Sequence, residues 1–123
     1  MKPRENFRVI GIKYLLSAQD MDRAVTFYRD IFGLEVIEQS PWWSELRYGS
    51  AIVALHGGGT GERHPTGLSF TVDSISAACL AIESTGAEIT SQPEDRGEEG
   101  IILAQFADAE GNIVMLSEVK QIT

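Results

Sequence analysis

The sequence contains almost no cysteine, few basic residues and no long apolar run. Cys79 is its single cysteine, so no disulfide can form within the chain, in agreement with a reducing compartment. The first eight residues are polar and lack the apolar stretch of a signal peptide. No apolar run approaches the roughly 20 residues that a membrane-spanning helix needs. We therefore expect a cytoplasmic protein.

The shortage of basic residues restricts the partners. Lys and Arg total 10 against 18 Asp and Glu, which gives a formal net charge of −8. Such a surface repels nucleic-acid phosphates and anionic membranes, so we expect neither as a partner. The 123 residues, 43% of them hydrophobic, are enough for a soluble domain that buries its own core without disulfide or metal support.

Hydrophobic periodicity and turn residues predict an alternating order of strands and helices. A strand is expected over residues 9–16, followed by a helix that Asp20 caps and Gly33 ends. Three short strands then follow, over residues 34–38, 43–49 and 51–56. The glycine-rich stretch from residue 57 to 65 lacks the Gly-Lys-Ser/Thr ending of a phosphate loop, so we interpret it as a linker.

The same order then repeats. A strand is predicted over residues 67–72, a helix over 75–84 between Asp73 as N-cap and Gly86 as stop, and strands over 87–90, 101–106 and 113–119. An offset of 53 relates Asp20 to Asp73 and Gly33 to Gly86. We therefore predict one domain, residues 1–123, built from two tandem βαβββ modules at about 8–57 and 66–119.

Each predicted module has a helix that covers one face of its sheet and leaves the other face open. Two open faces that meet would enclose a cleft, and a ligand would bind there. The predicted fold is therefore α+β, with two βαβββ modules that form an open, barrel-like sheet around a cleft.

Two motifs resemble those of a known superfamily. The run from Asp20 to Val25, with Phe27-Tyr28 and Phe32-Gly33-Leu34, resembles the first-helix signature of the vicinal-oxygen-chelate superfamily of glyoxalases, bleomycin resistance proteins and extradiol dioxygenases. The segment with Phe106, Asp108, Gly111 and Asn112 resembles the final turn of that superfamily, Phe-x-Asp-Pro-x-Gly-Asn. Ala109 stands where the superfamily has the proline. The resemblance implies the paired-module fold but no particular reaction.

The resemblance also implies four metal-ligand positions, one on the first and one on the last strand of each module. They align with Lys13, Ala54, Gly67 and Met115, where metal-binding members have His or Glu. A protonated lysine, two residues without donor side chains and a soft thioether are poor ligands for the metals that the family uses. We therefore expect no metal site and no cofactor.

Strand alternation predicts the side chains that face the cleft. The candidates for ligand binding are Lys13, Trp43, Glu45, Arg47, His56, Ser69 and Met115. His56 could be a base or a ligand contact, or only a histidine at a strand end. Lys13 could bind an anionic ligand, pair with Glu45, or extend to water. Glu45 and Arg47 could orient a ligand or pair across strands.

The two adjacent tryptophans point to opposite faces of a strand. Trp43 would stack on a planar ligand, although Trp42 and Trp43 could instead belong to the core or to a dimer interface. His64 is expected in a solvated loop, and Cys79 is expected as a small buried hydrophobe rather than a nucleophile.

The sequence therefore favours a metal-independent protein that binds a planar, polar small molecule, for antibiotic or metabolite sequestration, as a homodimer. One alternative is a glyoxalase-like or lyase-like enzyme that uses His56 and Glu45 with shifted metal ligands. Another alternative is a non-catalytic interaction or sensory domain.

Overall fold

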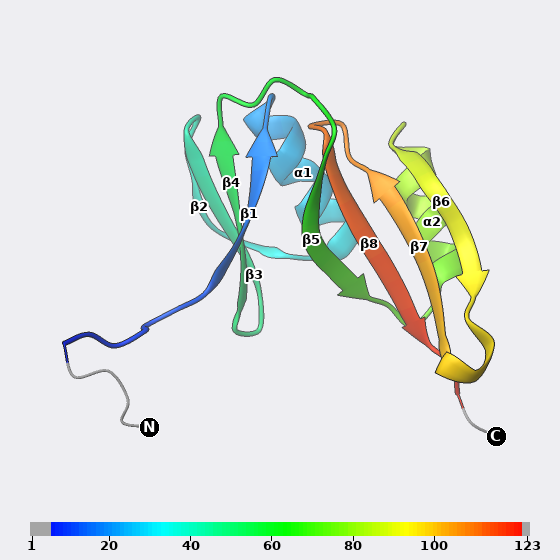
Figure 1. Cartoon of the computed structure of the whole chain (residues 1–123). Coiled ribbons are helices and arrows are strands. Elements are labelled where there is room, and N and C mark those ends of the chain that lie inside the picture. The colour runs from blue at the N-terminus through cyan, green and yellow to red at the C-terminus, as the bar shows by residue number, and fades with distance from the viewer. Residues whose placement is uncertain (1–5, 122–123) are drawn as a thin grey trace.

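The computed structural model describes residues 6–121 and contains two modules in tandem (Figure 1). Each module begins with a strand and a helix, and three more strands follow. Module one consists of β1 (Lys13–Ala18), α1 (Met21–Phe32), β2 (Glu35–Gln39), β3 (Trp43–Tyr48) and β4 (Ala51–Gly57). Module two consists of β5 (His64–Thr71), α2 (Ile75–Ser84), β6 (Glu88–Asp95), a short 3₁₀ helix η1 (Gly97–Glu99), β7 (Ile101–Ala107) and β8 (Asn112–Val119).

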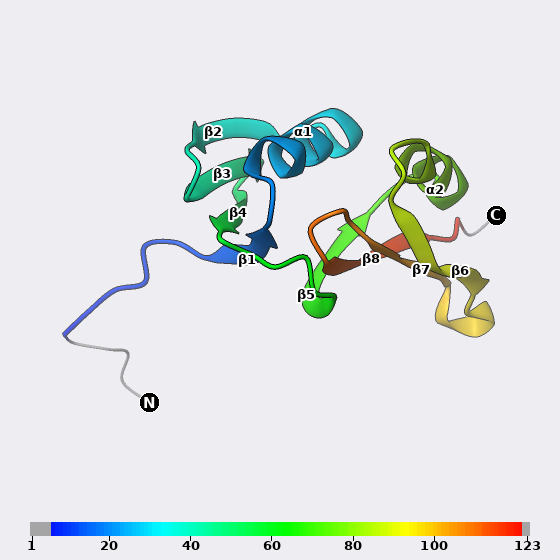
Figure 2. The ribbon, with the colours of Figure 1, turned by 90° about the horizontal axis from the view of Figure 1, so that it is seen from above.

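Each module forms its own four-stranded mixed sheet. The strand order is β1-β4-β3-β2 in sheet A and β5-β8-β7-β6 in sheet B. The first and last strands of each module pair in parallel, and the other neighbours pair antiparallel. The predicted α+β fold is confirmed, and the sheets of one chain do not close into a barrel. Figure 2 shows both helices on one side of the two sheets, so the other face of each sheet carries no helix.

Local sequence signals define both helices. The Asp20 side chain accepts a hydrogen bond from the backbone N–H of Arg23, and Gly33 ends α1 in the left-handed conformation, as predicted. The second cap is Ser74, not the predicted Asp73: its hydroxyl accepts from the backbone N–H of Ala77, 3.3 Å away. The backbone N–H of Ile75 donates to Glu118 Oε1 at 2.7 Å. A β8 carboxylate thus lies at the positive end of α2.

Three strand predictions had wrong boundaries. The first strand starts at Lys13, not at residue 9, because its parallel pairing with β4 begins at Lys13 opposite Ile52. The strand predicted for residues 87–90 extends to Asp95, where it pairs with β7. His64, expected in a loop, begins β5 opposite Asn112.

Aromatic rings of α1 connect the two modules through the core. Phe32 stacks on Phe70 of β5 with ring centroids 4.1 Å apart, and it also stacks on Phe106 of β7 at 5.7 Å. Phe27 meets the edge of Tyr28 at 4.9 Å. The first-helix motif therefore serves packing between the modules, since its aromatic residues contact sheet B as well as α1. No helix among the described residues is both long and apolar enough to cross a membrane.

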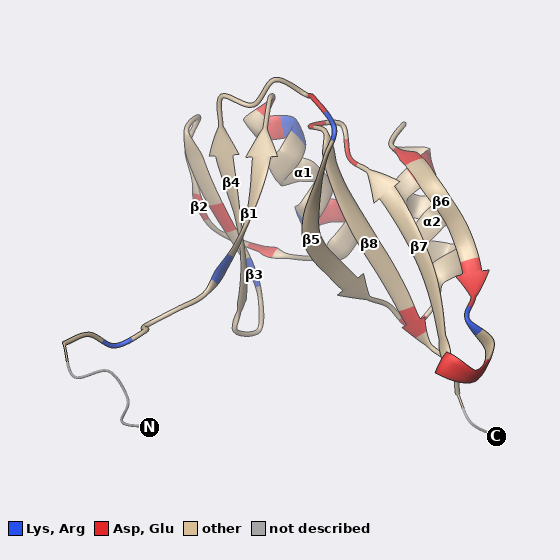
Figure 3. Cartoon of the chain, in the orientation of Figure 1, with Lys and Arg blue, Asp and Glu red and all other residues tan. Residues whose placement is uncertain are grey.

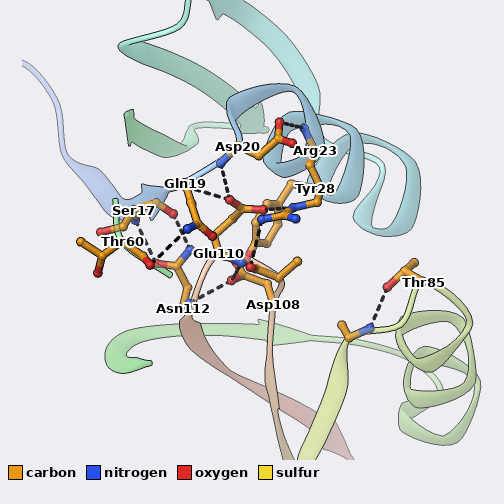
Figure 4. Close-up of polar contacts among 12 residues, drawn as sticks. Ser17, Gln19, Asp20, Arg23, Tyr28, Thr60, Thr85, Asp108, Glu110 and Asn112 are labelled. Carbon is orange, nitrogen blue, oxygen red and sulfur yellow. Dashed lines mark hydrogen bonds and ion pairs between the residues drawn. The ribbon is translucent and has the colours of Figure 1, made fainter. Parts of the chain in front are cut away.

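The turn before β8 holds module two against the start of α1 (Figure 4). Glu110 is 1% exposed, and its Oε1 accepts from the backbone N–H groups of Gln19 and Asp20 at 2.8 and 2.7 Å. Its Oε2 accepts from Arg23 Nε at 2.7 Å. We call Glu110 together with Asp108 and Asn112 the inter-module latch.

Asn112 and Asp108, the other two members of the latch, also form hydrogen bonds with module one. Asn112 exchanges two hydrogen bonds with the backbone of Ser17, at 2.9 and 2.7 Å. Tyr28 donates to Asp108 Oδ2 at 2.6 Å. Burial raises the pKa of Asp108, although the hydrogen bonds from Tyr28 and Asn112 oppose that effect. The final-turn motif is therefore a structural joint between modules.

Candidate functional site

The uncovered face of sheet A collects most of the candidate residues. In the strand register, Trp43 lies opposite His56, Glu45 opposite Ala54 and Arg47 opposite Ile52. On the other side of β4, Lys13 also lies opposite Ile52. Side chains two residues apart share a face, so β1, β4 and β3 present these residues together, as the alternation predicted.

Four of the candidates form one connected cluster, which we call the sheet A cluster. Lys13 Nζ donates to Glu45 Oε2 at 2.6 Å, and Trp43 Nε1 donates to the same oxygen at 2.8 Å. The Lys13 ammonium lies 5.8 Å from the centroid of the Trp43 ring, and the His56 ring meets Trp43 edge-on at 6.0 Å. The cluster thus joins an ammonium, a carboxylate, an indole and an imidazole.

The small side chain at the centre of β4 makes this cluster possible. Lys13 and Glu45 belong to β1 and β3, which are separated by β4, and Ala54 lies directly opposite Glu45. Ala54 is fully buried although it lies on the uncovered face. A larger residue there would fill the space between Lys13 and Glu45. Because the Lys13 side chain is 45% exposed, its ion pair with Glu45 adds little to the free energy of unfolding. Its main effect is to hold the two side chains in place.

Arg47 lies outside the cluster. Its Nε donates to Glu35 Oε1 at 2.5 Å, between the paired strands β2 and β3, and both side chains are more than half exposed. Of the two roles considered for Arg47 from the sequence, pairing across strands is therefore the one seen in this structure. Both cations expected in the cleft already have carboxylate partners.

The uncovered face of sheet B is polar and uncharged at its centre. Ser69 lies opposite Met115, and Thr71 lies opposite Ser117, with their hydroxyls 3.1 Å apart. Across β8, Gln105 lies opposite Met115. Figure 3 shows that β5, β7 and β8 carry no charge along most of their length. The two candidates from module two, Ser69 and Met115, therefore share one face but belong to a different sheet from the sheet A cluster.

The remaining candidates lie elsewhere. Trp42 is 74% exposed, so it does not pack in the core. Cys79 is buried, as expected, and burial raises the pKa of its thiol. Sequence reasoning missed the latch residue Glu110, because an acidic residue in a turn looks solvated. The signal that could have found it is its position inside the final-turn motif.

The electrostatics of the sheet A cluster give a first prediction. The hydrogen bond from Lys13, followed by that from Trp43, lowers the pKa of Glu45. A lowered pKa keeps the Glu45 carboxylate charged at more acidic pH. Its ion pair with Lys13 and its hydrogen bond from Trp43 are lost only as the pH falls through the lowered pKa of Glu45. We expect Trp43 fluorescence to change below the usual glutamate pKa of about 4.3. A Trp42→Phe background isolates the signal, and Glu45→Gln should abolish the transition. An unchanged transition in Glu45→Gln would refute the assignment.

The family model for the Glyoxalase/Bleomycin resistance protein/Dioxygenase superfamily matches residues 11–116. None of the curated proteins matches the sequence. Solved structures do match the fold. A fosfomycin resistance protein, FosX, from Listeria monocytogenes has a TM-score of 0.75 at 17% identity, covering 90% of this chain and 94% of its own.

Two further solved structures are also similar in fold. A lactoylglutathione lyase from Agrobacterium tumefaciens has a TM-score of 0.69 at 22% identity, covering 90% of this chain and 95% of its own. TnmS3, an antibiotic binding protein from Streptomyces sp. CB03234, has a TM-score of 0.67 at 20% identity, covering 93% and 100%. At these identities the similarity shows the fold, which hosts both enzymes and binding proteins.

Proposed function

This chain belongs to the Glyoxalase/Bleomycin resistance protein/Dioxygenase superfamily, and on that premise we propose that it binds a small planar molecule without a metal ion. The observation that carries the proposal is the sheet A cluster on an uncovered sheet face. It offers an aromatic ring with polar groups around it, which suits a ligand that stacks and forms hydrogen bonds. The antibiotic binding protein among the similar structures supports this class of function.

The residues at the family's metal positions do not fit a metal. The Lys13 ammonium is bound to Glu45, Ala54 and Gly67 have no donor side chains, and Met115 offers a soft thioether. Within residues 6–121, no group of three or more His, Cys, Asp or Glu side chains could hold a metal ion. Glu45 is also a poor general base, because its pKa is lowered. These features favour binding over metal-dependent catalysis.

Both uncovered faces remain exposed in a single chain, and this supports a homodimer. Leu15 shares the uncovered face of sheet A with Lys13 and is 59% exposed, and Met115 on the uncovered face of sheet B is 37% exposed. The strands β1 and β5 each lie at a sheet edge, where a neighbouring chain can pair or pack. We propose that a second copy closes the cleft, with part of each site contributed by the neighbour.

The dimer gives a second prediction. Light scattering at micromolar concentration should give twice the 13.5 kDa mass of one chain. Replacing both Leu15 and Met115 by Asp should shift the mass to that of one chain, since two charges would be buried without partners. The matched control is Leu80→Asp on the exposed face of α2, which should remain dimeric. A single-chain mass for the unmodified protein would contradict the proposal.

Ligand binding can be tested with one matched pair of small molecules. 2-Naphthamide is flat and carries a hydrogen-bonding amide, whereas decahydro-2-naphthamide has the same groups on a saturated frame. Stacking on Trp43 should add about 1 kcal/mol beyond area burial. We therefore expect the flat amide to change tryptophan fluorescence at lower concentration than its saturated counterpart, and equal responses would count against a stacking site.

A further inference from the structure

A hollow lies on the helix side of the molecule, away from the sheet A cluster. It measures about 620 Å³ and runs between α1, the start of β6 and the turn before β8. Ala24, Phe27 and Ile31 recur every three or four residues, so they form one stripe along α1 and make an apolar floor. Ala87 continues this floor from module two. The volume lies within the range of small-molecule sites.

The groove carries a strongly one-sided charge. Among the described residues that line the groove, Arg23 is the one basic residue. Five lining residues carry a carboxyl group: Asp20, Asp22, Asp30, Asp108 and Glu110. Arg23 already pairs with Glu110 at 2.7 Å. Figure 3 shows acidic residues on α1 and in the turn before β8. A negative potential therefore remains over an apolar floor.

The rim carboxylates are accessible. Asp22 and Asp30 are eight residues apart on α1, with Thr26 between them, so they follow the exposed edge of the groove. Asp22 accepts from the neutral amide of Gln39 at 3.0 Å, and Asp30 shares its charge with Arg29. Both Asp22 and Asp30 are exposed, so an incoming cation can reach them without opening the core.

We propose that this groove is a second binding site, selective for amphiphilic organic cations. The apolar body of such a ligand lies on Phe27, Ile31 and Ala87, and its ammonium or guanidinium group faces the acidic rim. A neutral analogue gains only the apolar contact. An anionic analogue meets the carboxylates at close range and is repelled. All residues of this site come from one chain, and none of them belongs to the sheet A cluster.

The probe is 4-phenylbutylamine, with 4-phenylbutanol and 4-phenylbutyrate as neutral and anionic analogues of the same body. Backbone amide NMR should show shifts from the amine at Thr26, Phe27 and Ala87. The alcohol should bind more weakly, and the carboxylate should cause no shifts there. Asp22→Asn with Asp30→Asn should lower the affinity for the amine about fivefold, and Thr26→Arg should lower it further.

Asp73→Asn with Glu94→Gln is the matched control, because it removes the same charge from exposed positions outside the groove. Its affinity for the amine should equal that of the parent. All substituted side chains are exposed, so folding should be kept, and thermal unfolding checks this. Equal binding of the three analogues, shifts confined to Trp43 and its neighbours, or unchanged affinity in the rim variant would each overturn the proposal.

Discussion

Replacing Glu110 by alanine is expected to lower the free energy of unfolding by about 3 kcal/mol, which is a large share of a small domain's stability. The carboxylate is buried and accepts from two backbone N–H groups and from Arg23. Its loss leaves those donors without their acceptor and opens a space between the modules. Urea unfolding followed by circular dichroism measures the change.

A graded series separates charge from hydrogen bonding in the latch. Glu110→Gln keeps one acceptor oxygen and the side-chain volume, so we expect it to cost about half as much as alanine. Glu88→Ala removes an exposed ion pair with Arg63 and serves as the control, with a change of about 0.5 kcal/mol or less. A cost for Glu110→Ala no larger than that of the control would show that the latch does not join the modules.

Replacing Trp43 by alanine is expected to weaken binding of 2-naphthamide about tenfold. The substitution removes the aromatic surface that the ligand stacks on and frees Glu45 from one of its two hydrogen-bond donors. Calorimetry or ligand-observed NMR is required, because the variant loses the fluorescent reporter. The fold should survive, since Trp43 lies on an uncovered sheet face and not in the core.

The neighbouring tryptophan provides a matched control for this result. Trp42 has the same side chain and is largely exposed, but it precedes β3 and lies outside the sheet A cluster. Trp42→Ala should therefore leave affinity for 2-naphthamide unchanged. If Trp43→Ala stays within twofold of the parent, or Trp42→Ala has the larger effect, the proposed stacking site is wrong.

The sequence predicted what depends on local chemistry. The Asp20 cap, the Gly33 end of α1 and the order of elements follow from residue type and periodicity. Asp73 was predicted as the cap in place of Ser74 because Asp and Ser both cap helices well. The position of Glu118 near Ile75 depends on the folded sheet. The extension of β6 to Asp95 likewise depends on pairing with β7, which periodicity alone does not reveal.

The candidate site was predictable as a face but not as a set of contacts. Alternation placed Lys13, Trp43, Glu45 and His56 on one side of sheet A, and the strand register agrees. Which partner Lys13 takes depends on the space above Ala54 and on side-chain rotamers, so several alternatives remained open. The contacts of the latch were not predictable either, because Glu110 accepts from backbone groups about 90 residues away.

The most direct test of metal-independent binding is a titration of chelator-treated protein with 2-naphthamide, followed by backbone and indole NMR. We expect saturable shifts of the Trp43 indole N–H and of its neighbours on β1, β3 and β4. The same affinity should be found after zinc, manganese or nickel is added. Metal-independent binding at this site is contradicted if Trp43 does not respond, or if binding appears only when one of these metals is present.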